Sequence, residues 1–415
     1  MNRKQLNIGL FGFGCVGYGL YQVLKETPGL KTTIKTIVVK HPGKARAISP
    51  GHFSYDRNAI LDDPEINVVV ELIDDADAAF EIVSRALKNG KAVVTANKKM
   101  IAEHFDELLR LQRAYDVPLL YEAACCASIP IIRNLEEYYN NDMLQSIEGI
   151  VNGSTNYILD KTSEEHLSYS EALTLAQEKG YAESDPTLDT KGFDAKYKLT
   201  ILLAHAFGLS VDPSDIVHIG IDRIGEPELA YAREKNMKIK LIAHASKNAA
   251  GNISAYVLPK FVPEGHKFSS VDGVFNGVIA QTSFADTQFF VGRGAGAYPT
   301  ASAVLSDLSA LTYDYRYEYK KLTGNEQLEH NEHILLKVFF RHDKDVKPAY
   351  GHYFDSIEES YTNANHAYIT GYISLKNLAE LYKSDEGNSF IQLDHAARID
   401  TKKTKKEESP YAIIE

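Results

Sequence analysis

A short apolar run near the start of the chain leads directly into a glycine-rich turn. The run covers residues 7–11, the turn reads GFGCVG over residues 12–17, and a helical pattern follows over residues 18–25. A G-x-G-x-x-G motif alone is a weak signal. Here it has the preceding strand and the following helix that a dinucleotide-binding turn requires. The residues expected to hold the cofactor at this turn are Gly12, Gly14, Cys15, Val16 and Gly17. A purely structural glycine turn is the alternative.

Further strand and helix patterns alternate through the first third of the chain. Apolar runs of strand length lie at 33–39, 67–72, 91–95 and 118–121, and helical patterns between them include 76–88 and 98–114. Such alternation predicts a parallel, doubly wound sheet with helices on both faces. Near-continuous apolar strands fit a sheet that is covered on both sides. We therefore expect a Rossmann-like α/β domain over residues 1–130.

The segment after the second predicted strand bears on which nicotinamide cofactor is used. An acidic residue is expected there for NAD, whereas a cation accommodates the extra phosphate of NADP. This chain has no acid over residues 38–46 but carries Lys40, Lys44 and Arg46. The pattern predicts a preference for NADP, with NAD as the other possibility. The alternative is a solvated basic loop.

Length, composition and charge exclude several classes of protein. A chain of 415 residues is too long for one ordinary core, so two or three domains are expected. A formal net charge of −11 argues against a nucleic-acid partner. No apolar run is long enough to span a membrane, and the N-terminus has no secretory segment. Cysteines number only three, which gives no disulfide framework. We expect a cytoplasmic protein.

The segment over residues 180–198 concentrates polar groups that a folded core alone would not require. Asp194 and Lys198 stand four apart where an apolar stretch begins, so they share one face if the stretch is helical. Glu183 and Asp189 lie in the loop before it. Carboxylates and an amine that converge on one pocket would suit a small zwitterion. The alternative is a solvated ion pair at a helix start.

Several separated motifs together resemble homoserine dehydrogenase, from about residue 7 to about residue 311. The motifs lie at residues 12–17, 95–98, 122–130, 149–157, 180–198 and 292–296. The resemblance implies interconversion of L-aspartate 4-semialdehyde and L-homoserine with a nicotinamide cofactor, in the route to threonine and methionine.

The resemblance also implies roles for individual residues. Hydride transfer to the aldehyde carbon leaves negative charge on the oxygen, which an amine can stabilise and protonate. By resemblance Lys198 is the proton donor and Lys98 a second lysine near cofactor and substrate; the sequence does not divide the acid–base role between them. A helix-start surface lysine is the alternative for Lys98. By resemblance Glu183, Asp189 and Asp194 serve in substrate binding or catalysis. Further cofactor contacts are expected at Thr95, Gly292 and Gly296.

A monovalent cation site, usually for sodium, is implied in the segment 122–129. The matching positions are Glu122, Cys125, Ala127 and Ile129, mostly through backbone carbonyls. The sequence departs from the family pattern here, because residues 126–128 (Cys-Ala-Ser) replace a glycine-rich stretch. That replacement restricts the backbone.

The remaining chain predicts two further domains. Strands are expected at 238–244, 253–258, 276–282 and 287–291, which suggest an α+β catalytic and dimerisation domain over residues 131–298. A helix within 299–319 would return to the dinucleotide domain. By resemblance the chain forms a homodimer or a higher homo-oligomer. Residues 320–415 are interpreted as a reduced ACT-like module with strands at 333–340 and 367–373, a helix at 375–382 and a mobile tail. Pro348-Ala349 is its nearest equivalent of the usual Pro-Gly.

Two other functions stay open at this point. The chain could be a related dehydrogenase that acts on another amino-acid aldehyde. It could also be a regulatory protein that binds the cofactor without turnover, although Lys98, Asp194 and Lys198 argue against this.

Overall fold

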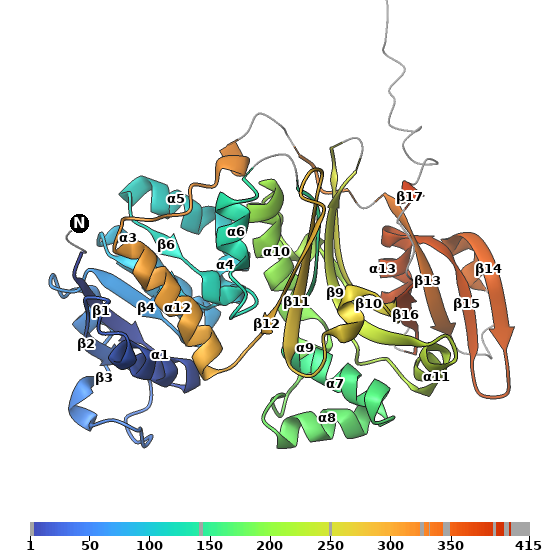
Figure 1. Cartoon of the computed structure of the whole chain (residues 1–415), viewed down its shortest axis with the longest axis horizontal. Helices are drawn as coiled ribbons and strands as arrows, with labels where there is room; N and C mark the ends of the chain where they lie inside the picture. Colours follow the sequence, from blue (N-terminus) through green and yellow to red (C-terminus); the bar gives the residue numbers. More distant parts are fainter. Residues whose placement is uncertain are drawn as a thin grey trace, which may run out of the picture. The chain divides into compact units, whose positions relative to one another are not determined.

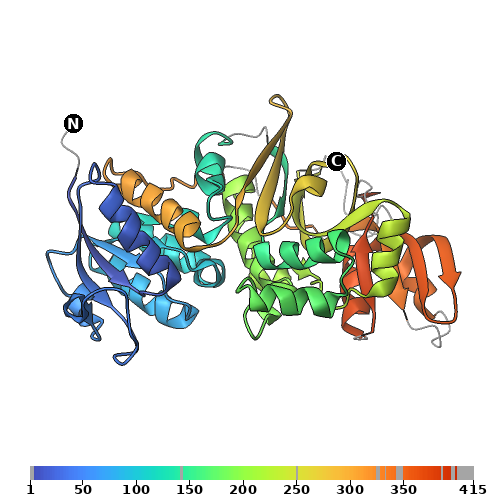
Figure 2. The same cartoon turned by 60° about the horizontal axis from the view of Figure 1, so that its bottom comes forward.

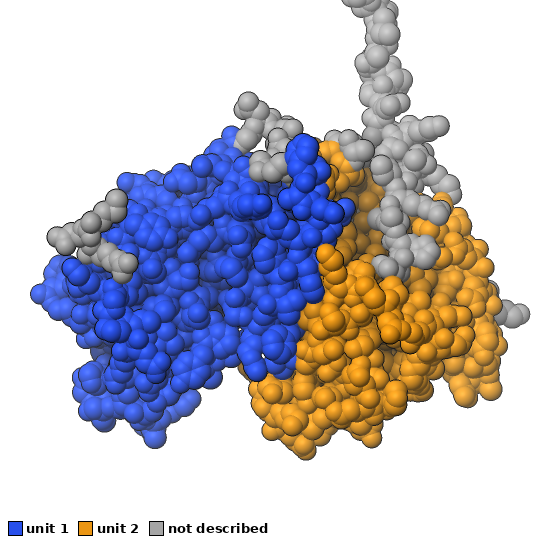
Figure 3. Space-filling view, in the orientation of Figure 1, with its two compact units in different colours: residues 1–144, 197–213, 274–327 blue, residues 145–196, 214–273, 328–415 orange. Residues whose placement is uncertain are grey.

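A computed structural model gives the fold of the chain (Figure 1). The structure describes residues 4–140, 144–248, 251–323, 328–331, 333–342, 349–384, 387–393 and 398–399. The chain divides into two compact units (Figure 3). The first unit comprises residues 1–144, 197–213 and 274–327, and the second unit comprises residues 145–196, 214–273 and 328–415.

The first unit is built on a six-stranded parallel sheet in the order β3-β2-β1-β4-β5-β6. Its strands are β1 (Leu6–Phe11), β2 (Thr32–Val38), β3 (Phe53–Ser54), β4 (Val68–Glu71), β5 (Ala92–Thr95) and β6 (Leu119–Leu120). This order is that of a doubly wound dinucleotide-binding sheet. Leu10, Val69 and Val94 on the central strands are wholly buried, as expected where helices cover both faces. The predicted Rossmann-like sheet is therefore confirmed.

The helices of the first unit differ from the predicted pattern at one place. They are α1 (Cys15–Glu26), α2 (Asn58–Leu61), α3 (Ala76–Lys88), α4 (Lys98–Glu103), α5 (Phe105–Tyr115), α6 (Ile131–Glu137) and α12 (Ala297–Leu311). The single helix predicted over 98–114 is wrong, because His104 leaves the helical conformation at φ −122° and separates α4 from α5. Its ring stacks on Phe80 with centroids 3.9 Å apart, which stabilises this break.

Helix α12 packs side by side with α1, as predicted for the returning helix (Figures 1 and 2). The two backbones approach closely at Gly19, where an added Cβ would lie 2.8 Å from the carbonyl oxygen of Ala297. The hairpin of β11 (Phe275–Thr282) and β12 (Thr287–Arg293) precedes α12 and confirms two predicted strands.

The second unit contains a larger mixed sheet in which β7-β9-β10-β16-β13-β15-β14 are successive neighbours. Its strands are β7 (Leu144–Ile150), β8 (Val217–His218), β9 (Met237–Lys247), β10 (Ile253–Pro263), β13 (Ile334–His342), β14 (Phe354–Thr362), β15 (Ala367–Ser374), β16 (Ser389–Gln392) and β17 (Arg398–Ile399). The strands predicted at 238–244, 253–258, 333–340 and 367–373 are confirmed, and β9 and β10 are longer than predicted. Strands β7, β8, β14, β16 and β17 were not predicted.

Helices surround this sheet at several points. They are α7 (Gly153–Glu164), α8 (Tyr169–Glu178), α9 (Thr187–Thr190), α11 (Glu226–Glu234) and α13 (Leu375–Ser384). Helix α10 (Phe193–Phe207) begins in the second unit and ends in the first. Short 3₁₀ turns occur at Pro50–His52, Glu122–Ala124, Pro213–Asp215, Lys267–Ser270, Lys320–Thr323 and Ala349–Tyr353.

The C-terminal strands share a hydrophobic core with the rest of the second unit. Tyr256 and Leu258 on β10 belong to the same buried cluster as Leu336 and Phe340 on β13. Parallel pairing of β10 with β16 makes the sheet continuous across this junction. The three-domain division and the ACT-like character of residues 320–415 stay predictions. Pro348 and the tail lie outside the described residues. In the part of the chain that the structure describes, no helix has the length and apolarity that a membrane span needs.

Candidate active site

Close contacts within the protein explain the glycines at positions 12 and 17 of the turn after β1, but not the glycine at position 14. Gly12 has φ +90°, and an added Cβ would lie 2.5 Å from the carbonyl oxygen of Leu72. A Cβ on Gly17 would lie 2.5 Å from the carbonyl oxygen of Gly12. Gly14 adopts an extended conformation and has no atom within 4 Å of an added Cβ. A ligand that approaches the backbone accounts for glycine at that position.

The amino end of α1 lies directly beyond Gly14. Gly14 is the N-cap residue and supplies no side-chain capping bond, so the first-turn N–H groups of Cys15 and Val16 are left for a ligand. The dipole of a twelve-residue helix adds a favourable field for phosphate oxygens. The turn therefore fits the pyrophosphate of a dinucleotide.

The loop after β2 fixes the positively charged side chain of Arg46 close to this turn. Arg46 donates from Nη1 to the carbonyl oxygen of Lys44 and from Nη2 to that of His41, both at 2.8 Å. Its guanidinium lies 5.1 Å from the ring centroid of Phe53, which packs edge-on against Phe13 of the glycine turn at 5.2 Å. Lys40 and Lys44 are exposed in the same loop. A fixed guanidinium beside the turn is suited to a ribose phosphate.

A buried carboxyl group organises the segment after β5. The Thr95 hydroxyl donates to Glu71 Oε2 at 2.5 Å, and the backbone N–H of Ile73 donates to Oε1 at 2.6 Å. The Thr95 hydroxyl oxygen accepts from the N–H of Asn97, whose side chain caps α4. Burial raises the pKa of Glu71 to about 7. This network fixes Thr95 and Lys98, the first residue of α4, at the carboxyl edge of the sheet.

The segment 122–129, which the resemblance implies as a cation site, contains a left-handed backbone conformation that is usually found in glycine. Cys126 and Ala127 have φ values of 53° and 38°, in the left-handed region that non-glycine residues rarely enter. The Cys-Ala-Ser replacement thus leaves the left-handed turn in place, at a cost of about 1 kcal/mol or more per residue. Both oxygens of Glu122 accept backbone N–H bonds, from Ile132 and Arg133 at 2.9 Å each, at the start of α6.

Two buried carboxyl groups share one guanidinium beside this segment. Asp307 on α12 accepts from the N–H of Glu122 and from Nη2 of Arg133, both at 2.9 Å. Burial and the charge of Asp307 raise the pKa of Glu122 to about 8, and burial raises the pKa of Asp307 to about 7, although the Arg133 guanidinium opposes both shifts. A bound cation would relieve this imbalance. Among the described residues no three His, Cys, Asp or Glu side chains cluster as a metal site would need. Glu122 and the carbonyls of Cys125, Ala127 and Ile129 offer oxygen atoms, which are the ligands that hard cations take.

Lys198 lies at the same edge of the sheet as the glycine turn. It is 7% exposed on α10, and the thiol of Cys125 donates to its carbonyl oxygen at 3.8 Å. Cys125 follows β6, and the glycine turn follows β1. Because the strands are parallel, their carboxyl ends meet at one edge.

Two of the three predicted carboxylates are held together in the second unit. The Asn152 side-chain amide donates to Asp189 Oδ1 at 2.7 Å and to Asp194 Oδ2 at 2.8 Å. Asn152 also caps α7 by accepting from the N–H of Thr155. Asp194 is 3% exposed. Two carboxylates on one neutral amide leave negative charge that suits an ammonium group.

Among the described residues, the Glu183 side chain makes no hydrogen bond to this pair of carboxylates. Its side chain is exposed between α8 and α9, and its backbone carbonyl accepts from Gln177 Nε2 at 3.0 Å. Gly292 lies near the end of β12, and Gly296 is the N-cap of α12. An added Cβ at Gly292 would lie 2.5 Å from Ser128 Oγ. Gly292 is thus required by its approach to the candidate cation segment.

Comparison with known proteins places the chain in a family. A homoserine dehydrogenase NAD-binding domain model matches residues 12–122, and a homoserine dehydrogenase model matches residues 130–309. The homoserine dehydrogenase of Synechocystis sp. is 39% identical over 313 residues, covering 73% of this chain and 72% of that protein. The one from Lactococcus lactis is 38% identical over 317 residues, with 73% of each chain covered.

The chain belongs to the homoserine dehydrogenase family.

Solved homoserine dehydrogenases agree with this assignment. The enzyme from Thiobacillus denitrificans superposes with a TM-score of 0.81 at 29% identity, covering 94% of this chain and 98% of that one. A hyperthermophilic archaeal homoserine dehydrogenase solved in complex with NADPH gives a TM-score of 0.64 at 26% identity, covering 76% and 99%. The nicotinamide-binding domain predicted from the glycine turn is confirmed.

Two residues that position the site of this homoserine dehydrogenase, Asn152 and Glu71, were not predicted from the sequence. Asn152 stands before Gly-Ser-Thr at a helix start, and this N-cap pattern was the available signal. Glu71 ends the otherwise apolar strand Val-Val-Val-Glu, where an acid in a buried position is itself a signal. The hydrogen-bond partners of these two residues could not be predicted from the sequence. Asp189 lies 37 residues after Asn152, and Thr95 lies 24 residues after Glu71.

Proposed function

We propose that this chain interconverts L-aspartate 4-semialdehyde and L-homoserine with NADP as the preferred cofactor. The observation that supports this best is the pair of carboxylates on Asn152, one of which, Asp194, stands four residues before Lys198 on α10. Residues four apart on a helix project from the same face. Asp194 and Asp189 would take the substrate ammonium, and Lys198 would serve the reacting oxygen.

The bound nicotinamide supplies or accepts the hydride. In the reducing direction Lys198 donates a proton to the aldehyde oxygen as its negative charge develops, and in the oxidising direction it takes the hydroxyl proton. Lys98, fixed at the start of α4 by the Glu71 network, stands as a second ammonium at the same sheet edge. Glu183, on an exposed loop, would contact the substrate only if that loop closes over it.

The proposed NADP preference rests on the loop after β2. Arg46 is held by two backbone carbonyls and by Phe53, and this part of the loop has no carboxylate to bind a ribose hydroxyl. Lys40 and Lys44 add positive charge to the same loop. These are the features that a ribose phosphate requires.

Three further proposals complete the function. A sodium ion would bind at Glu122 and at the carbonyls of Cys125, Ala127 and Ile129, where it offsets the buried charge of Glu122 and Asp307. The chain would act as a homodimer, or as a higher homo-oligomer, in the cytoplasm. Residues 320–415 would form an ACT-like module.

The deciding experiment follows NADPH absorbance with aspartate semialdehyde and a panel of other amino-acid aldehydes. We expect turnover with aspartate semialdehyde and at least about tenfold lower kcat/KM with the others, since the ammonium site fixes the distance to the carbonyl. Equal rates with another aldehyde would indicate a related dehydrogenase. No oxidation of NADPH with any aldehyde would indicate a cofactor-binding protein without turnover.

A further inference from the structure

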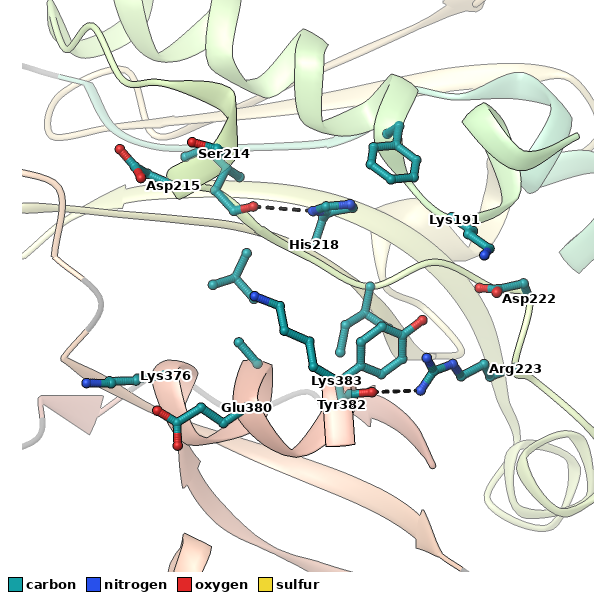
Figure 4. A pocket seen from close by; sticks show the side chains of 15 residues that line it. Lys191, Ser214, Asp215, His218, Asp222, Arg223, Lys376, Glu380, Tyr382 and Lys383 are labelled. Carbon is teal, nitrogen blue, oxygen red and sulfur yellow. Dashed lines mark hydrogen bonds between the residues drawn. The ribbon is translucent and has the colours of Figure 1, made fainter. Parts of the chain in front are cut away.

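A cavity of about 510 Å³ lies within the second unit, between α13 and the segment from Ser214 to Arg223 (Figure 4). That segment includes β8 and the turn that follows it. This volume is in the range of small-molecule sites. None of the residues assigned above to cofactor, substrate or cation lines the cavity.

Charged side chains of both signs line this cavity. The cations are Lys191, Arg223, Lys376 and Lys383, and the carboxylates are Asp215, Asp222 and Glu380. Cations outnumber carboxylates here, although the whole chain has a net charge of −11. Among the described residues the side chains of Lys191, Lys376 and Lys383 have no ion-pair or hydrogen-bond partner. The cavity therefore keeps positive charge that the protein itself does not neutralise.

One of these lysines extends into the space itself. In Figure 4 Lys383 reaches from α13 toward the strand that carries His218. Burial, together with the charges of Lys196 and Lys383, lowers the pKa of His218 to about 4. His218 is therefore a neutral polar group near neutral pH. An anion would remove part of the repulsion among these cations.

Flat side chains supply the remaining walls. The Arg223 guanidinium lies 3.7 Å from the ring centroid of Tyr382, and its Nη1 donates to the Tyr382 carbonyl oxygen at 2.9 Å. The rings of Phe193 and His218 are 4.7 Å apart. Fixed flat surfaces beside free ammonium groups suit a ligand with one planar part and one anionic part.

The segment between the cavity-lining residues Ile219 and Asp222 packs against the backbone of Thr190, next to Asp189. An added Cβ at Gly220 would lie 2.0 Å from the carbonyl oxygen of Thr190, and the N–H of Ile221 donates to that same oxygen at 2.7 Å. Thr190 follows Asp189 directly. Lys191 and Phe193, which line the cavity, come just before Asp194. A shift of this wall would move both carboxylates.

We propose that this cavity is a regulatory site for a small organic anion with a planar group, and that its occupancy changes the KM for aspartate semialdehyde. The KM effect rests on the proposed function, whereas the binding does not. A carboxylate and a phosphate share the chemistry that the lysines recognise, so both need to be tested.

Calorimetric titration of the full chain tests the binding. Phenyl phosphate and benzoate are the probes, benzyl alcohol is the uncharged control, and saturating NADP⁺ is present to occupy the dinucleotide site. We expect one of the two anions to bind and benzyl alcohol not to bind. Lys383→Glu and Lys191→Glu should each weaken binding about tenfold or more, as expected for loss of a charged contact. Lys267→Glu, at an exposed lysine elsewhere in the second unit, should leave it unchanged.

The outcomes separate this inference from the proposed function. Binding that Lys383→Glu and Lys191→Glu abolish would support the site even in a chain without turnover on aspartate semialdehyde. An active enzyme that binds neither anion, or whose binding is unchanged in both variants, would overturn the site and leave the function intact. Circular dichroism checks folding; if one variant is unfolded, the other decides. Binding without any change in KM would overturn the regulatory role.

Discussion

The side-chain amide of Asn152 donates to Asp194 at 2.8 Å while its oxygen caps α7. One residue thus joins the start of a helix to a buried carboxylate at the start of another. The second amide hydrogen reaches Asp189. The positions of both carboxylates therefore depend on a residue that need not touch the substrate.

Replacing Asn152 with alanine should raise the KM for aspartate semialdehyde about tenfold with a smaller change in kcat, because the two carboxylates lose their shared donor. Loss of the cap should also lower the free energy of unfolding by about 1 kcal/mol. Asp75→Ala removes the N-cap of α3 and is the matched control, because it should cost similar stability at unchanged KM. Steady-state kinetics and urea unfolding measure the two effects. Equal KM values in the two variants would show that Asn152 acts only as a cap.

Lys198→Ala should lower kcat/KM by about 10²- to 10⁴-fold, the range for loss of a general acid. The protein should stay folded and should still bind NADPH. Lys99→Ala, next to Lys98 on the exposed side of α4, should retain near-normal activity. Stopped-flow absorbance at saturating cofactor gives the chemical step. Normal turnover by a folded Lys198→Ala protein would exclude the proton-donor role of Lys198. If Lys98→Ala showed the predicted loss of kcat/KM and Lys198→Ala did not, the role would be assigned to Lys98.

Arg46→Ala should raise the KM for NADPH about tenfold and leave the KM for NADH within about twofold, since the guanidinium would contact only the ribose phosphate. Arg57→Ala is the control, because Arg57 pairs with Glu81 on the surface of the same unit. Parallel titrations with both cofactors measure the ratio. If the wild-type enzyme prefers NADH, the assignment of this loop to NADP is wrong.

Stability should fall as the pH rises from about 5 to about 8, in part because of Glu71. Its folded pKa of about 7 is above the unfolded value, so the folded state holds a proton that the unfolded state has already lost. Folding is therefore favoured below the unfolded pKa, and this advantage is lost as the pH rises through 7. The effect is on the order of 3 kcal/mol. Glu71→Gln should flatten the curve from urea unfolding, and the exposed Glu81→Gln should not. A Glu71→Gln curve parallel to that of the wild type would contradict the assignment.

Replacing sodium chloride with tetramethylammonium chloride should lower the Tm, because a cation too large for backbone carbonyls leaves Glu122 and Asp307 uncompensated. Glu122→Gln removes one of the two carboxyl groups that a bound cation would keep ionised, so its Tm should respond less to the change of salt. Differential scanning fluorimetry at constant ionic strength makes the comparison. Identical Tm values for the wild type in the two salts would argue against a sodium site.

Regular patterns made much of this fold predictable. Alternating apolar strands and helices gave the doubly wound sheet, since both faces of that sheet are buried and its strands read as continuous apolar runs. Strand β14 escaped prediction because it lies at the edge of its sheet, and all its residues after Phe354 are exposed. A strand exposed in this way shows no alternation of buried and exposed positions.

The candidate site residues could be proposed from the sequence, but the contacts that hold them in place could not. The positions of Asp189, Asp194 and Lys198 could be read from one short segment. The contacts that Asn152 and Glu71 make could not, since they join residues far apart along the chain. Cysteine and alanine rarely adopt a left-handed backbone, so this conformation at Cys126 and Ala127 could not be predicted from the sequence. Tertiary packing imposes it there.

The shared core of β10 and β13 sets a limit on how this protein could be shortened. Removing everything after residue 327 would expose Tyr256 and Leu258 to water and leave an open apolar edge on β10. A truncated version would need polar substitutions along that strand, or another polypeptide to cover it, before it could remain monodisperse.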